Sequence, residues 1–158
     1  DFFISDLVDP IEVGPTFPLI SQEYFEKLQR VLAENGIVVV QSGPVSPPSV
    51  MYHARLVNTL KAVFPYVHSY CAPTPSYGSP WGFTLCANHP LNTRPDPDVV
   101  DELITDTTTG GLRLIDGMSL LGMLQTPLYI RQAIAQNTEV YTLAKPPKFF
   151  GQGVISNQ

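Results

Sequence analysis

The sequence predicts an α/β fold in which two parallel strands lead into an antiparallel hairpin. Apolar runs at residues 2–4 and 36–41 flank a stretch with helical spacing, and a strand, a helix and a strand in this order form a βαβ crossover and a parallel sheet. Two aromatic and β-branched runs, residues 66–72 and 81–87, follow with only a short link of turn-forming residues between them. So short a link requires the two strands to pair antiparallel.

The first part of the chain gives each element its own signals. Residues 2–4 predict the end of a buried strand, which leads into an acidic, proline-containing loop. Residues 21–33 predict a helix capped by Ser21, and Gly36 beyond it can take the left-handed conformation that ends helices. The continuous β-branched run at 36–41 predicts a strand buried on both faces.

Helices and irregular segments dominate the rest of the predicted structure. A second helix is expected from residue 46 to about residue 64, with prolines in its first turn and another proline that stops it. Residues 98–104 predict one short helix, 112–115 a short strand, and 117–136 two short helices broken before Pro127. The tail from residue 137 carries little helical signal.

Composition limits the classes of partner. The chain has 158 residues, of which 44% are hydrophobic and 15% charged, enough for one globular domain with a core. A net charge of −5 disfavours nucleic acid and weakly suits a cationic ligand. No apolar run approaches the roughly 20 residues that span a membrane. Cys71 and Cys86 form neither a disulfide framework nor a zinc motif, so we expect reduced core thiols and a cytoplasmic protein without a metal.

The candidate chemistry lies on loops that follow strands. Asp6 and Asp9 come directly after the first strand, and ligands of open α/β sheets bind beyond the carboxyl ends of the strands. Tyr77, in the hairpin loop, could reach over the same rim. The alternatives are solvated turn aspartates and a surface-packed aromatic residue. His53, within the second helix, is expected to be a surface or packing residue, and no Ser-His-Asp arrangement can be argued.

Four segments resemble motifs of one enzyme family. Residues 6–15 read Asp-Leu-Val-Asp-Pro-Ile-Glu-Val-Gly-Pro. This is similar to the Asp-Leu-x-Asp-Pro-x-Glu-x-Gly-Pro segment of polyamine aminopropyltransferases, the spermidine/spermine synthase family, in its thermospermine-synthase form. Residues 70–83 resemble that family's Tyr-x-Ala-x-x-Pro-Thr/Ser-Tyr/Phe…Trp-Gly-Phe segment, and Gln-Ser-Gly-Pro at 41–44 resembles its Gln-Ala-Gly-Pro. Residues 137–141 and 149–153 resemble its tail, so the matches extend over essentially the whole chain.

The resemblance implies a fold and a reaction. The fold would be the C-terminal half of a class I methyltransferase-like, Rossmann-like sheet, with residues 1–90 as half of the catalytic domain and residues 91–158 as a helical and irregular extension packed on it. The reaction would move an aminopropyl group from decarboxylated S-adenosylmethionine to a polyamine and release 5′-methylthioadenosine. The Asp-Leu-Val-Asp form favours spermidine as acceptor and thermospermine as product. No metal is needed, since a sulfonium is already a good leaving group.

The same resemblance implies roles for individual residues. Asp6 would accept the proton of the attacking amine, while Asp9 and Tyr77 position the polyamine. Gln41 and Trp81 would line the acceptor channel, and Pro15 would border the adenine side.

The family's Gly-rich donor loop and its ribose-binding acidic residue are missing from the sequence. We therefore expect a missing N-terminal half, no cofactor bound by this chain alone, and an inactive fragment. The strand edge at residues 2–5 invites pairing, either with that half or in a homodimer. The alternative is a noncatalytic domain of the same fold that serves as a binding or oligomerisation module. A methyltransferase would not explain the paired motifs around Asp6 and Tyr77.

Overall fold

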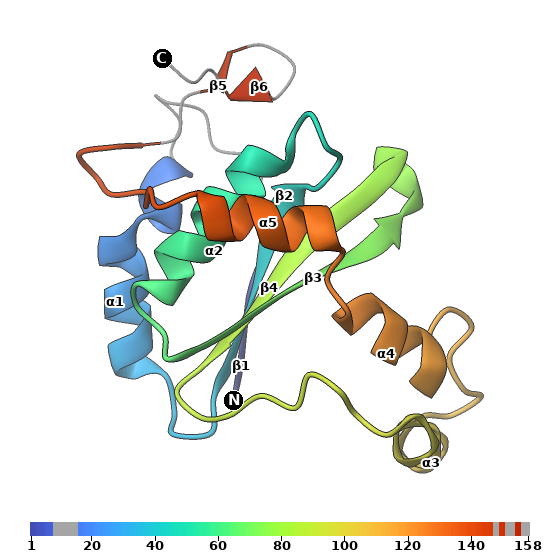
Figure 1. Ribbon diagram of the computed structural model, residues 1–158. Coiled ribbons are helices and arrows are strands. Elements are labelled where there is room, and N and C mark those ends of the chain that lie inside the picture. The colour runs from blue at the N-terminus through green and yellow to red at the C-terminus, as the bar shows by residue number, and fades with distance from the viewer. Residues whose placement is uncertain (8–15, 147–148, 151–153, 156–158) are drawn as a thin grey trace.

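The computed structural model describes residues 1–7, 16–146, 149–150 and 154–155, with side chains to residue 146 (Figure 1). A four-stranded mixed sheet forms its centre, in the order β1-β2-β4-β3. The strands are β1 (Phe2–Ser5), β2 (Ile37–Pro44), β3 (Tyr66–Thr74) and β4 (Ser79–Ala87). β1 and β2 are parallel, whereas β4 is antiparallel to both of its neighbours. The predicted α/β class and the hairpin are confirmed.

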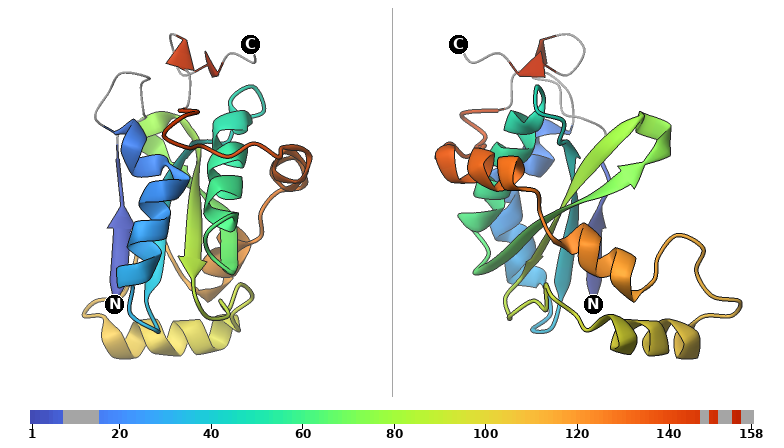
Figure 2. Two further views of the ribbon diagram at one scale, coloured as in Figure 1. Left: turned by 90° about the vertical axis from the view of Figure 1, so that its left-hand side faces the viewer. Right: turned by 45° about the vertical axis from the view of Figure 1, so that its right-hand side comes forward.

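Helices cover one face of this sheet (Figure 2). α1 (Gln22–Val31), α2 (Val50–Lys61) and α5 (Leu128–Gln136) lie on that face, while α3 (Pro97–Thr107) and α4 (Gly117–Leu124) lie toward the lower end of the sheet. The short elements are η1 (Phe17–Ile20), η2 (Pro75–Tyr77), β5 (Phe149–Phe150) and β6 (Val154–Ile155). α4 and α5 meet at Pro127, as the sequence predicted.

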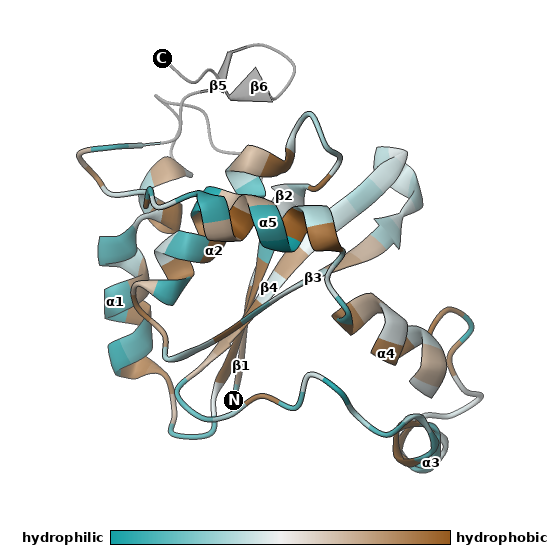
Figure 3. Cartoon of the chain, viewed as in Figure 1, coloured by the Kyte–Doolittle hydropathy of each residue, from teal (hydrophilic) through white to brown (hydrophobic). Residues whose placement is uncertain are grey.

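The hydrophobic core lies between the sheet and these helices. Phe25, Leu56 and Leu60 of α1 and α2 are fully buried against Val38 and Val40 of β2. Burying a side chain of this size stabilises the fold by about 1.5–3 kcal/mol. Figure 3 shows hydrophilic colour over much of α1 and hydrophobic colour on β1. The alternation of the strands therefore places the core on one face.

The opposite face of the sheet, called the open face below, is not covered in the same way. Phe2 and Ile4 of β1 are 76% and 72% exposed, and Val39 of β2 is only partly buried. α4 approaches this sheet at β3, where Nε2 of His68 lies 2.7 Å from the Leu124 carbonyl oxygen. The prediction of a buried first strand is wrong at Phe2 and Ile4, because no helix among the described residues lies over them. The prediction that β2 is buried on both faces is also wrong for the described residues, since Val38 and Val40 are buried but Val39, on the other face, is only partly buried.

The first helix ends differently from the prediction. The Ser21 hydroxyl caps it by accepting a hydrogen bond from the Tyr24 N–H at 3.3 Å, as expected. The helix stops at Val31, however, and Gly36 does not adopt a left-handed conformation. Its N–H closes a turn with the Ala33 carbonyl oxygen at 2.8 Å, and this turn needs no positive φ.

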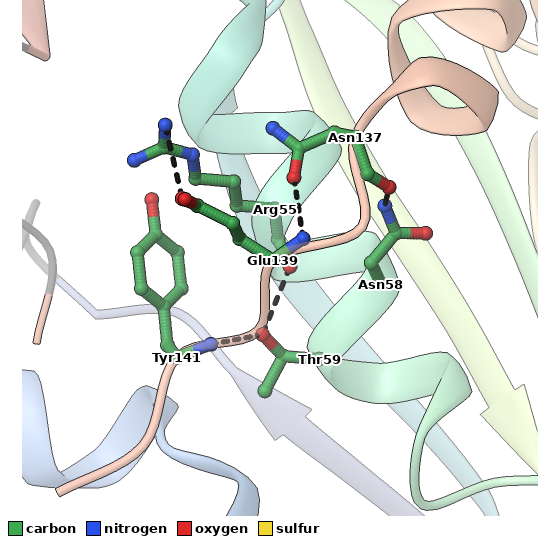
Figure 4. A network of polar contacts seen from close by, with 6 residues as sticks. All are labelled: Arg55, Asn58, Thr59, Asn137, Glu139 and Tyr141. Atoms are coloured by element: carbon green, nitrogen blue, oxygen red, sulfur yellow. Dashed lines mark hydrogen bonds and ion pairs between the residues drawn. The ribbon is translucent and has the colours of Figure 1, made fainter. Parts of the chain in front are cut away.

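Two segments near the C-terminal end also test the predictions. Residues 112–115 form no strand, because they belong to the link between α3 and α4, away from both edges of the sheet. Residues 137–141 are extended and lie along α2 (Figure 4). There the Tyr141 N–H donates to the Thr59 hydroxyl at 2.8 Å, and Arg55 pairs with Glu139 at 3.1 Å. Hydrogen bonds from α2 thus hold this segment in place.

Candidate functional site

The end of β2 turns sharply at the edge where β1 also ends. The register between β2 and β4 shifts between Gln41 and Pro44, and Gly43 has a φ of +81°. The Gln41 side-chain oxygen accepts a hydrogen bond from the Gly43 N–H at 3.2 Å. This bond holds the Gln41 amide at the strand end. A side chain at residue 43 would also collide with the Tyr52 ring, since an added Cβ would lie 2.4 Å from it.

A pocket of about 300 Å³ opens on the open face at this edge. It collects side chains from the end of β1, from β2, and from both strands of the hairpin and the loop between them. Its lining residues are Ile4, Ser5, Asp6, Val39, Gln41, Tyr70, Thr74, Tyr77, Trp81 and Phe83. Four residues singled out in the sequence, Asp6, Gln41, Tyr77 and Trp81, therefore meet in one cavity although they are up to 75 positions apart.

Aromatic rings form the walls of this pocket. Tyr77, in the hairpin loop, lies against Trp81 with ring centroids 4.3 Å apart. Tyr70 and Phe83 stack with centroids 5.4 Å apart and an angle of 25° between their planes. Burial raises the pKa of the Tyr70 hydroxyl, so that group stays neutral at physiological pH. Aromatic faces of this kind attract ammonium groups and also pack against the methylene chain between them.

The sequence reasoning missed two of these walls, Tyr70 and Phe83. Both could have been found from the pairing of the hairpin strands and the alternation of side chains along them. Tyr70 and Phe83 are paired in the hairpin register, and Phe83 lies two residues beyond Trp81, which places the two side chains on the same face of β4. Register and alternation together were sufficient to find them.

The charge in the pocket is negative. Asp6 is the one ionisable carboxyl among its described lining residues, and neither Lys nor Arg contributes to that lining. A pocket lined by a carboxyl group, an amide and aromatic rings is suited to a cation that carries apolar segments. A linear polyamine has this chemistry.

The remaining predictions concern two further site residues, the cysteines, metal binding and membrane spans. Asp9 and Pro15, two of the predicted site residues, lie outside the described residues. Cys71 and Cys86 are free thiols, and burial raises the pKa of both. Cys86 is buried in the core as predicted, whereas Cys71 is only partly buried. In the described part of the chain, no cluster of three potential ligands could hold a metal ion, and none of the helices there is long and apolar enough to cross a membrane.

His53 is more deeply placed than the sequence indicated. It is fully buried on α2, behind the sheet, and both ring nitrogens have hydrogen-bond partners. Helical spacing alone could not find this, because its partners come from strands elsewhere in the chain.

Comparisons with known proteins agree on one family. The model of the family described as "Spermine/spermidine synthase domain" matches residues 1–96. A polyamine aminopropyltransferase of Synechococcus sp. (strain JA-3-3Ab) is 45% identical over 151 residues, which cover 94% of this chain and 48% of that protein. Thermospermine synthase ACAULIS5 of Arabidopsis thaliana is 30% identical over 159 residues, covering 98% and 45%. The chain thus spans about half the length of these curated relatives.

Solved structures show the same fold. The spermidine synthase from Thermotoga maritima superposes with a TM-score of 0.64 at 15% identity, covering 80% of this chain and 42% of that one. A spermidine synthase in complex with the transition-state analogue AdoDATO gives a TM-score of 0.62 at 14% identity, with 75% and 40% covered. Sequence and fold together show that this chain belongs to the spermine/spermidine synthase family.

Proposed function

We propose that the protein containing this chain transfers an aminopropyl group from decarboxylated S-adenosylmethionine to a polyamine and releases 5′-methylthioadenosine. One observation carries the proposal: the carboxylate of Asp6, the amide of Gln41 and the rings of Tyr77 and Trp81 line a single pocket at the edge of the sheet. Family membership supports the same reaction class.

In this proposal Asp6 is the general base. An alkylammonium has no lone pair for attack, so the acceptor amine must first lose a proton, and the Asp6 carboxylate takes it. The free lone pair then attacks the terminal carbon of the aminopropyl group. The carbon–sulfur bond breaks as the new carbon–nitrogen bond forms, and its electron pair returns to sulfur, which converts the sulfonium into a neutral thioether. Holding amine and carbon in line is the main task left to the protein.

The aromatic pocket is assigned to the acceptor. Trp81 and Tyr77 hold the methylene chain and one ammonium group, and the Tyr77 hydroxyl orients the nucleophile. Asp9 would bind a second ammonium group, and Pro15 would border the adenine. We propose spermidine as the acceptor and thermospermine as the product. The Asp-Leu-Val-Asp segment and the thermospermine synthase among the relatives support this choice.

Apart from the adenine contact of Pro15, the donor site is assigned to a part of the protein that this chain does not contain. The chain covers about half of its relatives, and the exposed Phe2 and Ile4 leave an apolar surface beside the pocket. We propose that an N-terminal half covers this surface and supplies the donor site, that residues 1–90 complete its catalytic domain with residues 91–158 packed on it, and that the isolated chain is inactive. Association as a homodimer and a cytoplasmic location, supported by the free thiols, belong to the same proposal.

Activity of the full gene product tests the proposal. Purified protein is incubated with decarboxylated S-adenosylmethionine and spermidine, and mass spectrometry follows thermospermine and 5′-methylthioadenosine. Replacing Asp6 by Asn should lower kcat by about 10²–10⁴-fold, the usual contribution of a general base. Asp106→Asn, the same change at an exposed position on α3, is the matched control and should leave kcat unchanged.

Two results would contradict the proposal. Equal kcat values for Asp6→Asn and the wild type would remove the base. A wild-type protein that forms no product but binds spermidine would favour the alternative, a noncatalytic binding or oligomerisation module.

A further inference from the structure

One buried side chain contacts three of the four strands that contribute to the pocket. His53 lies on α2, on the helix-covered face of the sheet, and has no exposed surface. Its Nδ1 atom is 3.2 Å from the Ser42 carbonyl oxygen of β2, and its Nε2 atom is 2.8 Å from the Ser69 hydroxyl of β3. β2 and β3 are not neighbours, because β4 lies between them. The imidazole and its two hydrogen bonds therefore connect β2 to β3 across the strand that lies between them.

The strand between them is contacted at a glycine. A Cβ added at Gly82 of β4 would lie 2.3 Å from Nδ1 and 2.6 Å from Cε1 of His53. The ring thus occupies the space of the missing side chain and lies directly on the β4 backbone. A larger residue at 82 would displace the imidazole or bend the strand.

The chemistry of the partners fixes the state of the ring. Burial lowers the pKa of His53 to about 4, so the imidazole is neutral at physiological pH. The Ser42 carbonyl oxygen can only accept a hydrogen bond, so Nδ1 carries the proton and donates to it. Nε2 then accepts from the Ser69 hydroxyl. The neutral ring thus donates one hydrogen bond to β2 and accepts one from β3, so a single tautomer of His53 satisfies both partners.

Each contact of His53 is one residue away from the pocket. Successive side chains of a strand point to opposite faces. Ser42 follows Gln41, Ser69 precedes Tyr70, and Gly82 lies between Trp81 and Phe83. The pocket side chains that follow from this pattern are Gln41, Tyr70, Trp81 and Phe83.

We propose that His53 is a positioning residue for the acceptor pocket: from behind the sheet it fixes β2, β3 and β4 relative to one another, and so fixes the spacing of the pocket walls. This inference rests on the proposed function, because it takes the pocket to be the polyamine site. Neighbouring bonds strengthen the arrangement. The Ser42 and Thr84 hydroxyls are 2.8 Å apart, and the Thr126 hydroxyl donates to the Ser69 carbonyl oxygen. Binding sites lose affinity when such supporting groups let the walls shift.

The test separates positioning from stability. In the full gene product, His53→Leu removes both bonds, and His53→Asn keeps an amide donor near the Nδ1 position. Thr59→Val is the matched control, since Thr59 is equally buried on α2 but bonds to the Arg55 carbonyl and the Tyr141 N–H, away from the pocket. KM for spermidine, kcat and the melting temperature are measured for each variant.

We expect His53→Leu to raise the KM for spermidine about tenfold and to change kcat less. His53→Asn should recover part of this loss, whereas Thr59→Val should lower the melting temperature without changing KM. Equal KM values for His53→Leu and Thr59→Val would overturn the inference. If His53→Leu does not fold, Ser69→Ala replaces it: this variant removes one hydroxyl and should raise KM about threefold, and an unchanged KM would overturn the inference.

Spermidine binding by calorimetry separates this inference from the proposed reaction. A wild-type protein that binds spermidine without transferring an aminopropyl group overturns the reaction alone, and the Kd values of the same variants then decide the role of His53. A wild-type protein that neither transfers nor binds overturns both.

Discussion

The two faces of the central sheet are made by the same strands and have opposite characters. On the helix-covered face the side chains are apolar, or polar with their bonds completed inside the protein, as in the set of Ser42, His53, Ser69 and Thr84. On the open face the aromatic rings and the Asp6 carboxylate line a pocket, and Phe2 and Ile4 are exposed. Alternate residues thus give one face to the core and the other to the pocket, and in our proposal the shape of the pocket depends on the face behind it.

The largest effect is expected from breaking the covered face. Phe25→Ala removes a fully buried ring from the core, and in the full gene product it should lower the free energy of unfolding by about 3–5 kcal/mol. Ile4→Ala is the matching change on the open face. It should cost about 2 kcal/mol or more if an N-terminal half covers this face, as we propose, and less than about 0.5 kcal/mol if the face stays in water. Urea unfolding of both variants measures the difference. A cost of about 2 kcal/mol or more at Ile4 would show that another part of the protein covers this face.

The next effect is a dependence of stability on pH, which comes from His53 on the helix-covered face. The pKa of His53 is about 4 in the folded protein and 6.5 when unfolded. The unfolded chain therefore binds the proton more tightly, and stability is lost as pH falls from 6.5 to 4. The loss from this group should reach about 3 kcal/mol, since one pKa unit corresponds to about 1.4 kcal/mol. Urea unfolding across this range should show the loss in the wild type and a flatter profile in His53→Gln.

The smallest effect is expected from one hydroxyl on the open face. Tyr77 is half exposed and its ring lies against Trp81, so Tyr77→Phe keeps the stacking and removes only the hydrogen-bonding group. Loss of one such bond should lower kcat/KM for spermidine about three- to tenfold, and the melting temperature should not change. If kcat/KM is unchanged in Tyr77→Phe but falls in Tyr77→Ala, the ring alone matters and the hydroxyl does not orient the nucleophile.

The sequence predicted much of the fold because most signals were local. The Ser21 cap, the short hairpin link and the break at Pro127 each appear as predicted. Residues 112–115 were predicted as a strand, but a strand needs an edge to pair with, and no strand of the described residues lies beside them. The open face could not be predicted from alternation, since what covers a strand is decided by other parts of the molecule.

The site was predictable to a similar extent. Motif resemblance identified Asp6, Gln41, Tyr77 and Trp81, and all four line the pocket. Tyr70 and Phe83 required the hairpin register. The burial of His53 could not be predicted, because its contacts come from β2, β3 and β4, and the sequence predicts only the pairing of β3 with β4.

The stacking of Tyr77 on Trp81 has a practical consequence. Trp81 is the single tryptophan of this sequence, and it lies in the wall of the pocket against the ring of the hairpin loop. Its indole is therefore a built-in optical reporter. A cation that enters the pocket changes the surroundings of that one chromophore, so emission from this chain follows occupancy directly, without a label and without turnover.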